Sequence, residues 1–430
     1  MPWLKLLLTG HQKYLALSLA VVGFSSLLGV NYFVEKASIK PNVDTILVQS
    51  SNASSSAVLT IATESSQAVP PTKSPDPKPQ PAGSPAPQAK KEVNTPTPAN
   101  NRLGWPNNKF GMYSYKDPES IRLTAELVNS NGGDWGWILF PINIKDHGVD
   151  SWNTIFSICK ENHLIPILQI IMDGGYTPTD ADIEEAADFM NQLSWPTKRK
   201  YVTAFNEVNA AEYWGNRIDP TDVANKLNKF IDAFKARSGD FFLMNGALNA
   251  SARTGKVLTN LGVQTEYLGE PDFLEQMNNA VPGIFKKLDG WAVHTYPQPE
   301  YRGKPLDTTI SGEAAWEKGR NTMSSYKWEQ NILRSKFGVD LPIFITEMGW
   351  PHKEGTSPRS GWYDQNTVSD YYKIVFRDLL LKDNNVVSVA PFGIKVTGLD
   401  NFSFVGNDGY RYPQFDALKS LPKIAGNPPR

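Results

Sequence analysis

The sequence predicts an α/β protein, a (β/α)8 barrel that follows a transmembrane helix and a disordered, proline-rich linker. Three observations lead to this prediction. An uncharged stretch lies near the N-terminus, a segment rich in Ser, Ala, Thr and Pro follows it, and the rest of the chain alternates short apolar runs with amphipathic stretches. We therefore divide the 430 residues into an anchor at 1–36, a linker at 37–101 and a barrel domain at 102–430.

The N-terminal segment is expected to span a membrane. Residues 14–33 contain no charged side chain, and about twenty residues at 1.5 Å per residue cross the apolar core of a bilayer. A cleaved signal peptide usually has a shorter apolar core and a cleavage site of small residues. We therefore expect an uncleaved anchor with the barrel outside the cytoplasm, and secretion after cleavage is the alternative.

The linker is expected to be an extended spacer. Between positions 70 and 98, ten of the 29 residues are proline. Such a composition cannot bury enough apolar surface to offset the entropy lost on ordering. In a polyproline-like conformation of about 3.1 Å per residue, this part alone reaches roughly 90 Å.

The barrel prediction is based on the number and order of its elements. Eight apolar runs predict strands at 110–114, 135–140, 164–171, 201–206, 241–246, 290–296, 343–347 and 386–392. Amphipathic stretches predict helices at 118–129, 151–162, 179–193, 220–237, 312–337 and 367–382, with a last helix after Pro413. Capping residues begin three of these helices, namely Asp117, Thr179 and Asp219. Continuously apolar strands separated by helices indicate a parallel sheet. Eight such units in this length favour a closed barrel over a doubly wound sheet, for which no glycine-rich phosphate loop is present.

Composition excludes several classes of function. The chain has 43 Lys and Arg against 44 Asp and Glu, whereas nucleic-acid binders need a positive surface. The single cysteine, Cys159, lies in an apolar run and predicts a buried, unreactive thiol. The five histidines lack the spacing of a metal site. We therefore expect no metal, no cofactor and no nucleic-acid partner.

Two strand ends carry the strongest chemical signal. In a (β/α)8 barrel, the reacting groups come from the C-terminal ends of the strands. Glu207 follows the fourth predicted strand, and Glu347 ends the seventh. Either glutamate alone is more often a helix cap or an ion-pair partner. Together they provide the two carboxyl groups that cleavage of a glycosidic bond requires, one protonated and one ionised.

The motifs around these glutamates resemble those of a known clan. The sequence is similar to the retaining glycoside hydrolases of clan A, which include the cellulase-like family 5 and the xylosidase-like family 39. The resemblance covers the predicted strands four to eight and depends on Asn206-Glu207, His294-Thr295-Tyr296 and Thr346-Glu347-Met348-Gly349-Trp350.

The resemblance implies a role for each matched residue. Glu207 would be the general acid and base, and Glu347 would be the nucleophile of a double displacement. Asn206 would bind the 2-hydroxyl of the sugar, Tyr296 would donate a hydrogen bond to Glu347, and His294 would lie beside them. The expected substrate is a poly- or oligosaccharide.

Aromatic residues are expected to supply the remaining sugar contacts. Trp350 and Trp214 are the leading candidates for stacking on a sugar ring, and the other candidates are Tyr213, Trp362 and Trp316. Large aromatic side chains also fill cores, and we assign Trp135 and Trp137 to the core.

The sequence departs from the clan at three strands. The end of strand two, 140–145, has Asn143 and Lys145 but no arginine, and strand eight ends on Phe392 instead of tryptophan. The end of strand three, 168–171, lacks a His-Asn pair that is common in cellulase-like members. These departures keep two alternatives open. One is a barrel that binds glycans without cleaving them, and the other is an envelope transglycosylase that uses the same two carboxylates.

Overall fold

The computed structural model describes residues 102–173, 175–258 and 264–430. The predicted anchor at 1–36 and linker at 37–101 lie outside the described residues. Within the described ranges, no helix is both long and apolar enough to cross a membrane.

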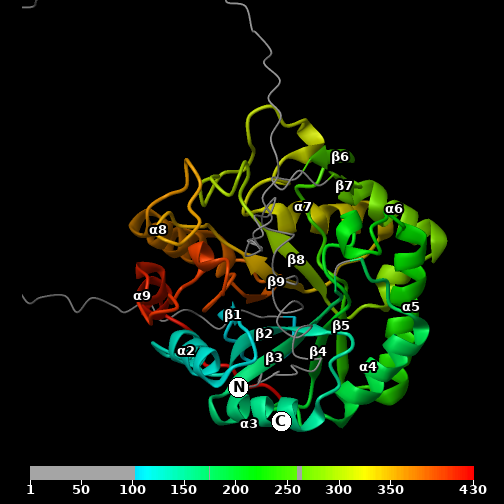
Figure 1. Cartoon of the computed structure of the whole chain (residues 1–430), viewed down its shortest axis with the longest axis horizontal. Helices are drawn as coiled ribbons and strands as arrows, with labels where there is room; N and C mark the ends of the chain where they lie inside the picture. The colour runs from blue at the N-terminus through cyan, green and yellow to red at the C-terminus, as the bar shows by residue number, and fades with distance from the viewer. Residues whose placement is uncertain (1–101, 174, 259–263) are drawn as a thin grey trace, which may run out of the picture. The chain divides into compact units, whose positions relative to one another are not determined.

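Eight parallel strands form the centre of the molecule (Figure 1). Five of them make one sheet in chain order, namely β1 (Gly111–Tyr113), β2 (Gly136–Asn143), β3 (Leu164–Ile171), β4 (Lys200–Thr203) and β5 (Phe241–Met244). The other three make a second sheet in the order β10 (Val386–Val389), β9 (Ile343–Met348) and β8 (Trp291–Thr295). Strand β3 has the bounds predicted from the sequence, and the other seven strands overlap their predicted ranges.

Two parallel bridges join these sheets into a closed barrel. Met244 pairs with Gly290 between β5 and β8, and Phe110 pairs with Val389 between β1 and β10. The first junction requires glycine, because a Cβ at Gly290 would lie 2.7 Å from the ring of Phe242. The eight-stranded parallel barrel predicted from the sequence is therefore present.

A helix follows each barrel strand and lies outside the barrel (Figure 1). In chain order the helices are α2 (Pro118–Val128), α3 (Val149–Glu161), α4 (Asp180–Gln192), α5 (Pro220–Arg237), α6 (Glu270–Ala280), α7 (Ser325–Ile332), α8 (Gln365–Val375) and α9 (Pro413–Ser420). The three predicted caps are confirmed. Asp117, Thr179 and Asp219 each accept a hydrogen bond from a backbone N–H in the first turn of α2, α4 and α5. Such caps satisfy N–H groups that have no partner within the helix.

The prediction of one helix over 312–337 is wrong for its first half. Gly312 and Gly319 have φ of +85° and +93°, values that end regular helix. The segment contains only the short turn η3 (Ala315–Glu317) before α7, and a π-helical turn, η4 (Leu333–Phe337), follows α7.

The sequence did not predict the elements between β5 and β8. This part of the chain contains an antiparallel hairpin, β6 (Gly255–Leu258) and β7 (Gln264–Tyr267), then α6 and the turn η2 (Ile284–Lys287). The predicted helix at 367–382 forms α8 and the π-helical turn η5 (Phe376–Leu380), and short turns η1 (Ala211–Tyr213) and η6 (Asp400–Phe402) follow β4 and β10.

The apolar core has two parts. One lies between the strands and the helices and includes Cys159, which is buried as predicted. The other fills the barrel with aromatic side chains, among them Trp137, Tyr201 and Phe344. The ring centroid of Trp137 lies 4.9 Å from that of Tyr201 and 5.6 Å from that of Phe344. This packing closes the barrel interior, so a site for a ligand must lie beyond the ends of the strands.

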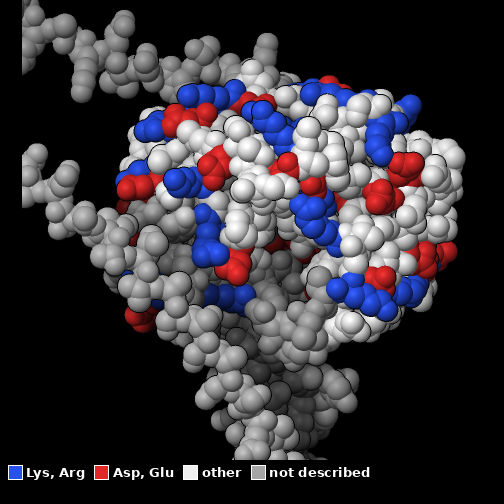
Figure 2. All heavy atoms as spheres, turned by 90° about the horizontal axis from the view of Figure 1, so that it is seen from above, with Lys and Arg blue, Asp and Glu red and all other residues white. Residues whose placement is uncertain are grey.

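Charges of both signs are mixed on the outer surface. On the face in Figure 2, Lys and Arg side chains are interspersed with Asp and Glu side chains. That face therefore has no extended patch of one sign, in line with the nearly neutral composition.

Candidate active site

Glu207 follows β4 in an uncommon backbone conformation. Phe205 and Glu207 have φ of +71° and +43°, which residues with a Cβ adopt only when their surroundings hold them there. The Glu207 N–H donates to the carbonyl of Ala247 at 2.8 Å. A Cβ at Gly246 would lie 2.2 Å from the carbonyl oxygen of Ala204. The turn after β4 thus packs directly on the chain after β5, and this contact fixes the position of Glu207.

An irregular pairing of β8 with β9 places the second glutamate. Val293 pairs with Ile345, but the next pair is His294 with Glu347, so the register skips one residue of β9. Such irregularities change the direction of side chains and are frequent beside active sites. Here the shift pairs the histidine and the glutamate directly at the ends of their strands.

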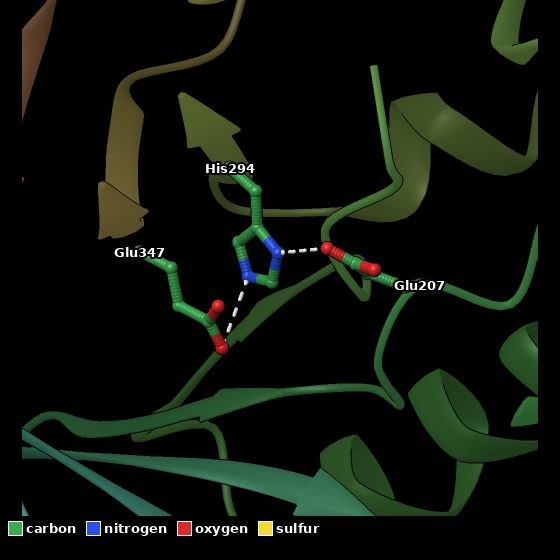
Figure 3. Close-up of side chains that lie close together, drawn as sticks. All are labelled: Glu207, His294 and Glu347. Atoms are coloured by element: carbon green, nitrogen blue, oxygen red, sulfur yellow. Dashed lines mark hydrogen bonds and ion pairs between the residues drawn. The ribbon is translucent and has the colours of Figure 1, made fainter. Parts of the chain in front are cut away.

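His294 lies between the two glutamates (Figure 3). Its Nδ1 atom is 2.8 Å from Oε1 of Glu207, and its Nε2 atom is 3.7 Å from Oε1 of Glu347. All three side chains are buried: His294 is 1% exposed, Glu207 is 2% exposed and Glu347 is 4% exposed. One oxygen of each carboxyl group lies within 4.8 Å of the other. Two buried carboxyl groups therefore face one imidazole at the C-terminal end of the barrel.

Further polar side chains contact this group. The Tyr296 hydroxyl donates to Oε2 of Glu347 at 3.0 Å. Gln169 of β3 forms a second hydrogen bond with Glu347 and donates from Nε2 to Oδ1 of Asn206 at 2.5 Å. The structure thus brings together five residues that the sequence selected, and Gln169 joins them.

Burial dominates the ionisation of the site. It raises the pKa of Glu207 to about 8, against an opposing hydrogen bond with Asn249. Burial and the charge of Glu207 also raise the pKa of Glu347, but its contacts with the imidazole, the phenol and the Gln169 amide oppose the shift. Burial lowers the pKa of His294. Because Glu347 has more contacts that favour the charged form, Glu207 is the carboxyl that keeps its proton at neutral pH.

A pocket with a cavity volume of about 30 Å³ lies over these residues. Its floor includes Glu207, His294 and Tyr296, and its wall includes Ser251 and Arg320. Polar groups that converge on one concave pocket with displaced pKa values are typical of a ligand site.

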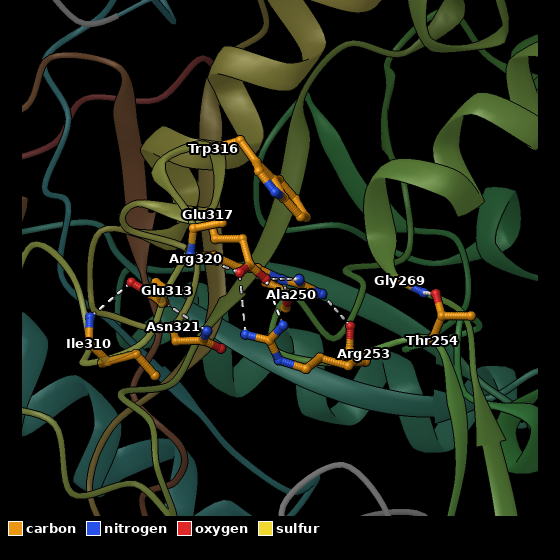
Figure 4. Close-up of polar contacts among 12 residues, drawn as sticks. Ala250, Arg253, Thr254, Gly269, Ile310, Glu313, Trp316, Glu317, Arg320 and Asn321 are labelled. Carbon is orange, nitrogen blue, oxygen red and sulfur yellow. Dashed lines mark hydrogen bonds and ion pairs between the residues drawn. The ribbon is translucent and has the colours of Figure 1, made fainter.

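Arg320 fixes the wall of the pocket (Figure 4). Its guanidinium donates to the carbonyl of Ala250 at 2.7 Å, to the carbonyl of Ala252 and to Oε1 of Glu317 at 2.8 Å. Oε1 of Glu317 also pairs with Arg253 at 3.0 Å. These contacts connect the loop after β5 with the loop after β8.

The predicted stacking residues do not line the pocket. Trp350 is 0% exposed and donates from Nε1 to the carbonyl of Gly303 at 2.7 Å. Trp214 is also 0% exposed and donates to Asp222 at 3.0 Å. Neither indole has an exposed face for a sugar, because both side chains are fully buried. Trp316, by contrast, is 60% exposed and lies beside Arg320 at the pocket wall.

The same three side chains also carry atoms that could be metal ligands. Glu207, His294 and Glu347 offer one donor atom each within 4.8 Å. The two nitrogens of the imidazole, however, point toward different carboxyl groups (Figure 3), whereas metal ligands converge on one point. We therefore interpret the arrangement as a hydrogen-bonded chain.

Sequence reasoning missed four residues near the two glutamates. Gln169 and Asn249 contact them directly. Burial and the charge of Glu207 raise the pKa of Glu212 to about 7, and burial and the charge of Glu347 raise that of Tyr115 to about 12. A usable signal existed only for Gln169, which is the one polar side chain in the apolar run of β3.

Comparisons with known proteins found remote structural similarities but no matching family. No protein-family model and no curated protein matches the sequence. Among solved structures, the chain is similar to the GH39 enzyme from Xanthomonas axonopodis pv. citri, with 13% identity, a TM-score of 0.46 and coverage of 76% of this chain and 67% of that one. It is also similar to a GH128 endo-β-1,3-glucanase from Sorangium cellulosum, with 14% identity, a TM-score of 0.45 and coverage of 73% and 98%. A triple variant of an endo-β-1,4-glucanase from Xanthomonas axonopodis pv. citri has 13% identity, a TM-score of 0.44 and coverage of 71% and 90%. Similarity with TM-scores below 0.5 carries no argument about function, which has to be argued from the side chains.

Proposed function

We propose that this protein is a retaining glycoside hydrolase that cleaves O-glycosidic bonds of a poly- or oligosaccharide, as a divergent member of clan A. The observation that carries the proposal is the pair of buried carboxyl groups of Glu207 and Glu347, which face one imidazole within 4.8 Å at the barrel end. Retaining glycosidases have their carboxyl groups about 5–5.5 Å apart, whereas inverting enzymes need about 6.5–9.5 Å to admit a water molecule. The short separation favours the retaining mechanism.

Glu207 is the general acid of the proposed reaction. Its raised pKa leaves it protonated at neutral pH, ready to donate to the departing oxygen. Before a substrate binds, the protonated carboxyl group of Glu207 donates a hydrogen bond to Nδ1 of His294. The imidazole then carries its own proton on Nε2, which faces Glu347. In this tautomer the neutral imidazole favours a proton on one carboxyl group and a negative charge on the other.

Glu347 is the nucleophile. In the first step its oxygen bonds to the anomeric carbon, the glycosidic C–O bond breaks, and the proton of Glu207 passes to the leaving oxygen. In the second step water attacks the same carbon, Glu207 takes the proton of that water, and the ester bond to Glu347 breaks.

Three neighbours support these steps. Tyr296 holds the Glu347 carboxylate through its hydroxyl, and His294 orients both glutamates. Asn206 precedes the acid and binds the 2-hydroxyl of the sugar, an interaction that strengthens as positive charge develops on the ring.

The anchor and the linker set the proposed location. A membrane span at 14–33 followed by a proline-rich spacer would hold the barrel outside the cytoplasm, within reach of an envelope or extracellular glycan.

The decisive experiment is a substrate screen with a nucleophile variant. The purified protein and its Glu347→Gln variant are incubated with aryl β-glycosides and polysaccharides. We expect the parent to release product and the variant to lose at least about 10³-fold in kcat, because no covalent intermediate can form.

The matched control is Glu300→Gln, which removes a carboxylate that is 63% exposed and paired with Arg302. This variant should keep full activity. Unchanged turnover in Glu347→Gln would exclude the nucleophile assignment. Binding of a glycan by a parent that cleaves none of the substrates would favour the non-catalytic alternative, and longer products would favour transglycosylation.

A further inference from the structure

Gln169 is an unusual residue for its position. Strand β3 is buried along its whole length, and seven of its eight residues are apolar. Gln169 lies on the face of Ile165 and Ile167, which point into the barrel, and it is 3% exposed. A buried amide costs stability unless its polar atoms have partners, so its contacts explain its presence.

Those contacts join two strands that carry the site. The Nε2 group donates to Oδ1 of Asn206 beyond β4 at 2.5 Å, and the amide also hydrogen-bonds to Glu347 of β9. Because a primary amide has two N–H donors, one side chain can serve both acceptors. Its Oε1 atom is buried without a hydrogen-bond partner in the structure.

The bridge determines which end of Asn206 is free. With Oδ1 turned toward the Gln169 amide, the Nδ2 donor of the Asn206 side chain points away from Gln169. A hydroxyl group that lies beside Nδ2 accepts a hydrogen bond from it. The orientation that Asn206 needs to bind a sugar hydroxyl is thus imposed from β3.

The Gln169 side chain that bridges Asn206 and Glu347 is uncharged. Among residues 102–173, 175–258 and 264–430, the basic side chain within 4.0 Å of a Glu347 oxygen is His294, and burial lowers the pKa of its imidazole. A neutral amide can hold a carboxylate in place without the strong attraction of a guanidinium.

We propose that Gln169 is a positioning residue that holds Glu347 in place for attack and presents the Nδ2 group of Asn206 to the sugar 2-hydroxyl. This inference rests on the proposed glycosidase function. It assigns to β3 a part in the site that the motifs on β4, β8 and β9 do not include.

Two consequences separate this role from a structural one. Removing the amide removes a hydrogen bond that favours the charged form of Glu347, so its titration should move to higher pH. Removing it also frees Asn206 to rotate, so the enzyme should discriminate less between a glycoside and its 2-deoxy analogue.

The test uses three variants of the full chain. Gln169→Met keeps the side-chain length without a donor, and Gln169→Asn keeps an amide too short to reach both partners. Gln414→Met is the matched control, because Gln414 is a buried glutamine that donates to the carbonyl of Ser403 away from the catalytic pair. Circular dichroism verifies folding, and Gln169→Asn decides the question if Gln169→Met does not fold.

The first readout needs no turnover. The infrared band of the protonated Glu347 carboxyl group is identified by its loss in Glu347→Gln and is followed against pH. We expect the titration midpoint to rise by about half to one pH unit in both Gln169 variants, as loss of one hydrogen bond implies, and to stay in place in Gln414→Met. An unchanged midpoint in the Gln169 variants would overturn the positioning of Glu347.

The second readout is kinetic. We expect kcat to fall about 10- to 100-fold in the Gln169 variants with a smaller change in KM, together with a reduced preference for the 2-hydroxyl substrate. Parent-like kinetics with parent-like titration would refute the inference while the glycosidase proposal stands. An inactive parent with a shifted titration would refute the glycosidase proposal and keep the contact between Gln169 and Glu347.

Discussion

The roles that we propose for Glu207 and Glu347 are based on their surroundings. Two carboxyl groups this close repel each other when both are ionised, so one of them retains a proton. Glu347 has a phenol, an amide and an imidazole that favour its charge, whereas Asn249 alone favours the charge of Glu207. At the scale of single residues, the hydrogen-bond donors around each glutamate decide which one is the acid and which one the nucleophile in the proposed reaction.

The pH profile should report this division. Glu207 must be protonated to act as the acid, and its pKa is about 8. We therefore expect kcat/KM to fall as the pH rises through about 8, because the free enzyme then loses the proton that the leaving group needs. Initial rates with an alkyl glycoside between pH 5 and 10 measure this basic limb.

A Glu207→Gln variant provides the control for this prediction. It should lose about 10²- to 10⁴-fold on substrates with poor leaving groups and much less on activated aryl glycosides, and its basic limb should disappear. A basic limb that persists unchanged in Glu207→Gln would assign the titration to another group.

Contacts between residues that are far apart in the sequence could not be predicted from the sequence. The two glutamates were selected because barrel chemistry lies at strand ends, which apolar runs make visible, and the structure brings them together at His294. Trp350 was assigned to sugar binding because of its position after Glu347, but its burial depends on loops far away in the chain. The role of Gln169 depends on neighbours from two other strands, which no local pattern reveals.

At the scale of elements, helices α6 and α7 contain a second acidic pair. Glu270 begins α6 and Glu329 lies in α7, and both are 0% exposed. Their side chains hydrogen-bond to each other, and Trp291 of β8 donates to Glu329 at 3.0 Å. Burial, together with the charge of Glu270 in the case of Glu329, raises the pKa of both carboxyl groups. The contact between these elements therefore holds at least one proton at neutral pH.

This pair should make stability depend on pH. A carboxyl group with a raised pKa in the folded state binds more protons folded than unfolded, so the free energy of unfolding falls as the pH rises above about 4.5. Glu270→Gln keeps a neutral partner for Glu329 at every pH. We expect the variant to be more stable than the parent by about 1–3 kcal/mol at pH 8 and similar to it at pH 5. Urea unfolding at the two pH values measures the difference.

Glu275→Gln is the control on the same helix. Its carboxylate is 54% exposed and pairs with Lys336 at 2.7 Å, so its replacement should leave the stability close to that of the parent at both pH values. A parent with equal stability at pH 5 and pH 8 would contradict the interpretation of the buried pair.

Helices and strands were predicted well where one hydrophobic pattern continues over several residues. Strand β3 is apolar throughout, and its bounds were found from the sequence. The helix at 312–337 was overextended because Gly312 and Gly319 interrupt a pattern that otherwise looks amphipathic. The β6–β7 hairpin was missed because its strands are short, and its register depends on contacts within the pair.

At the scale of the whole molecule, the barrel separates stability from chemistry. Aromatic rings such as Trp137, Tyr201 and Phe344 fill its interior, and the polar pocket lies beyond the C-terminal ends of the strands. The loops after β5 and β8, joined by Arg320, form the wall of that pocket. Changes in these loops would therefore alter what the proposed site binds without loss of the core, as is general for this type of barrel.

The remaining prediction concerns the anchor. If residues 14–33 span a membrane, the full chain should pellet with membranes, resist extraction by alkaline carbonate and dissolve in detergent. The substitutions Leu19→Lys and Val22→Lys should release the chain from the membrane, because each lysine costs about 2.5–3.5 kcal/mol at the centre of a span. Ala57→Lys, in the linker, is the control, and this variant should stay bound to the membrane.

The orientation of the chain has its own test. Protease added outside intact cells should remove the barrel. A full chain found in the soluble fraction before any extraction would contradict the anchor, and a barrel protected from external protease would contradict its orientation.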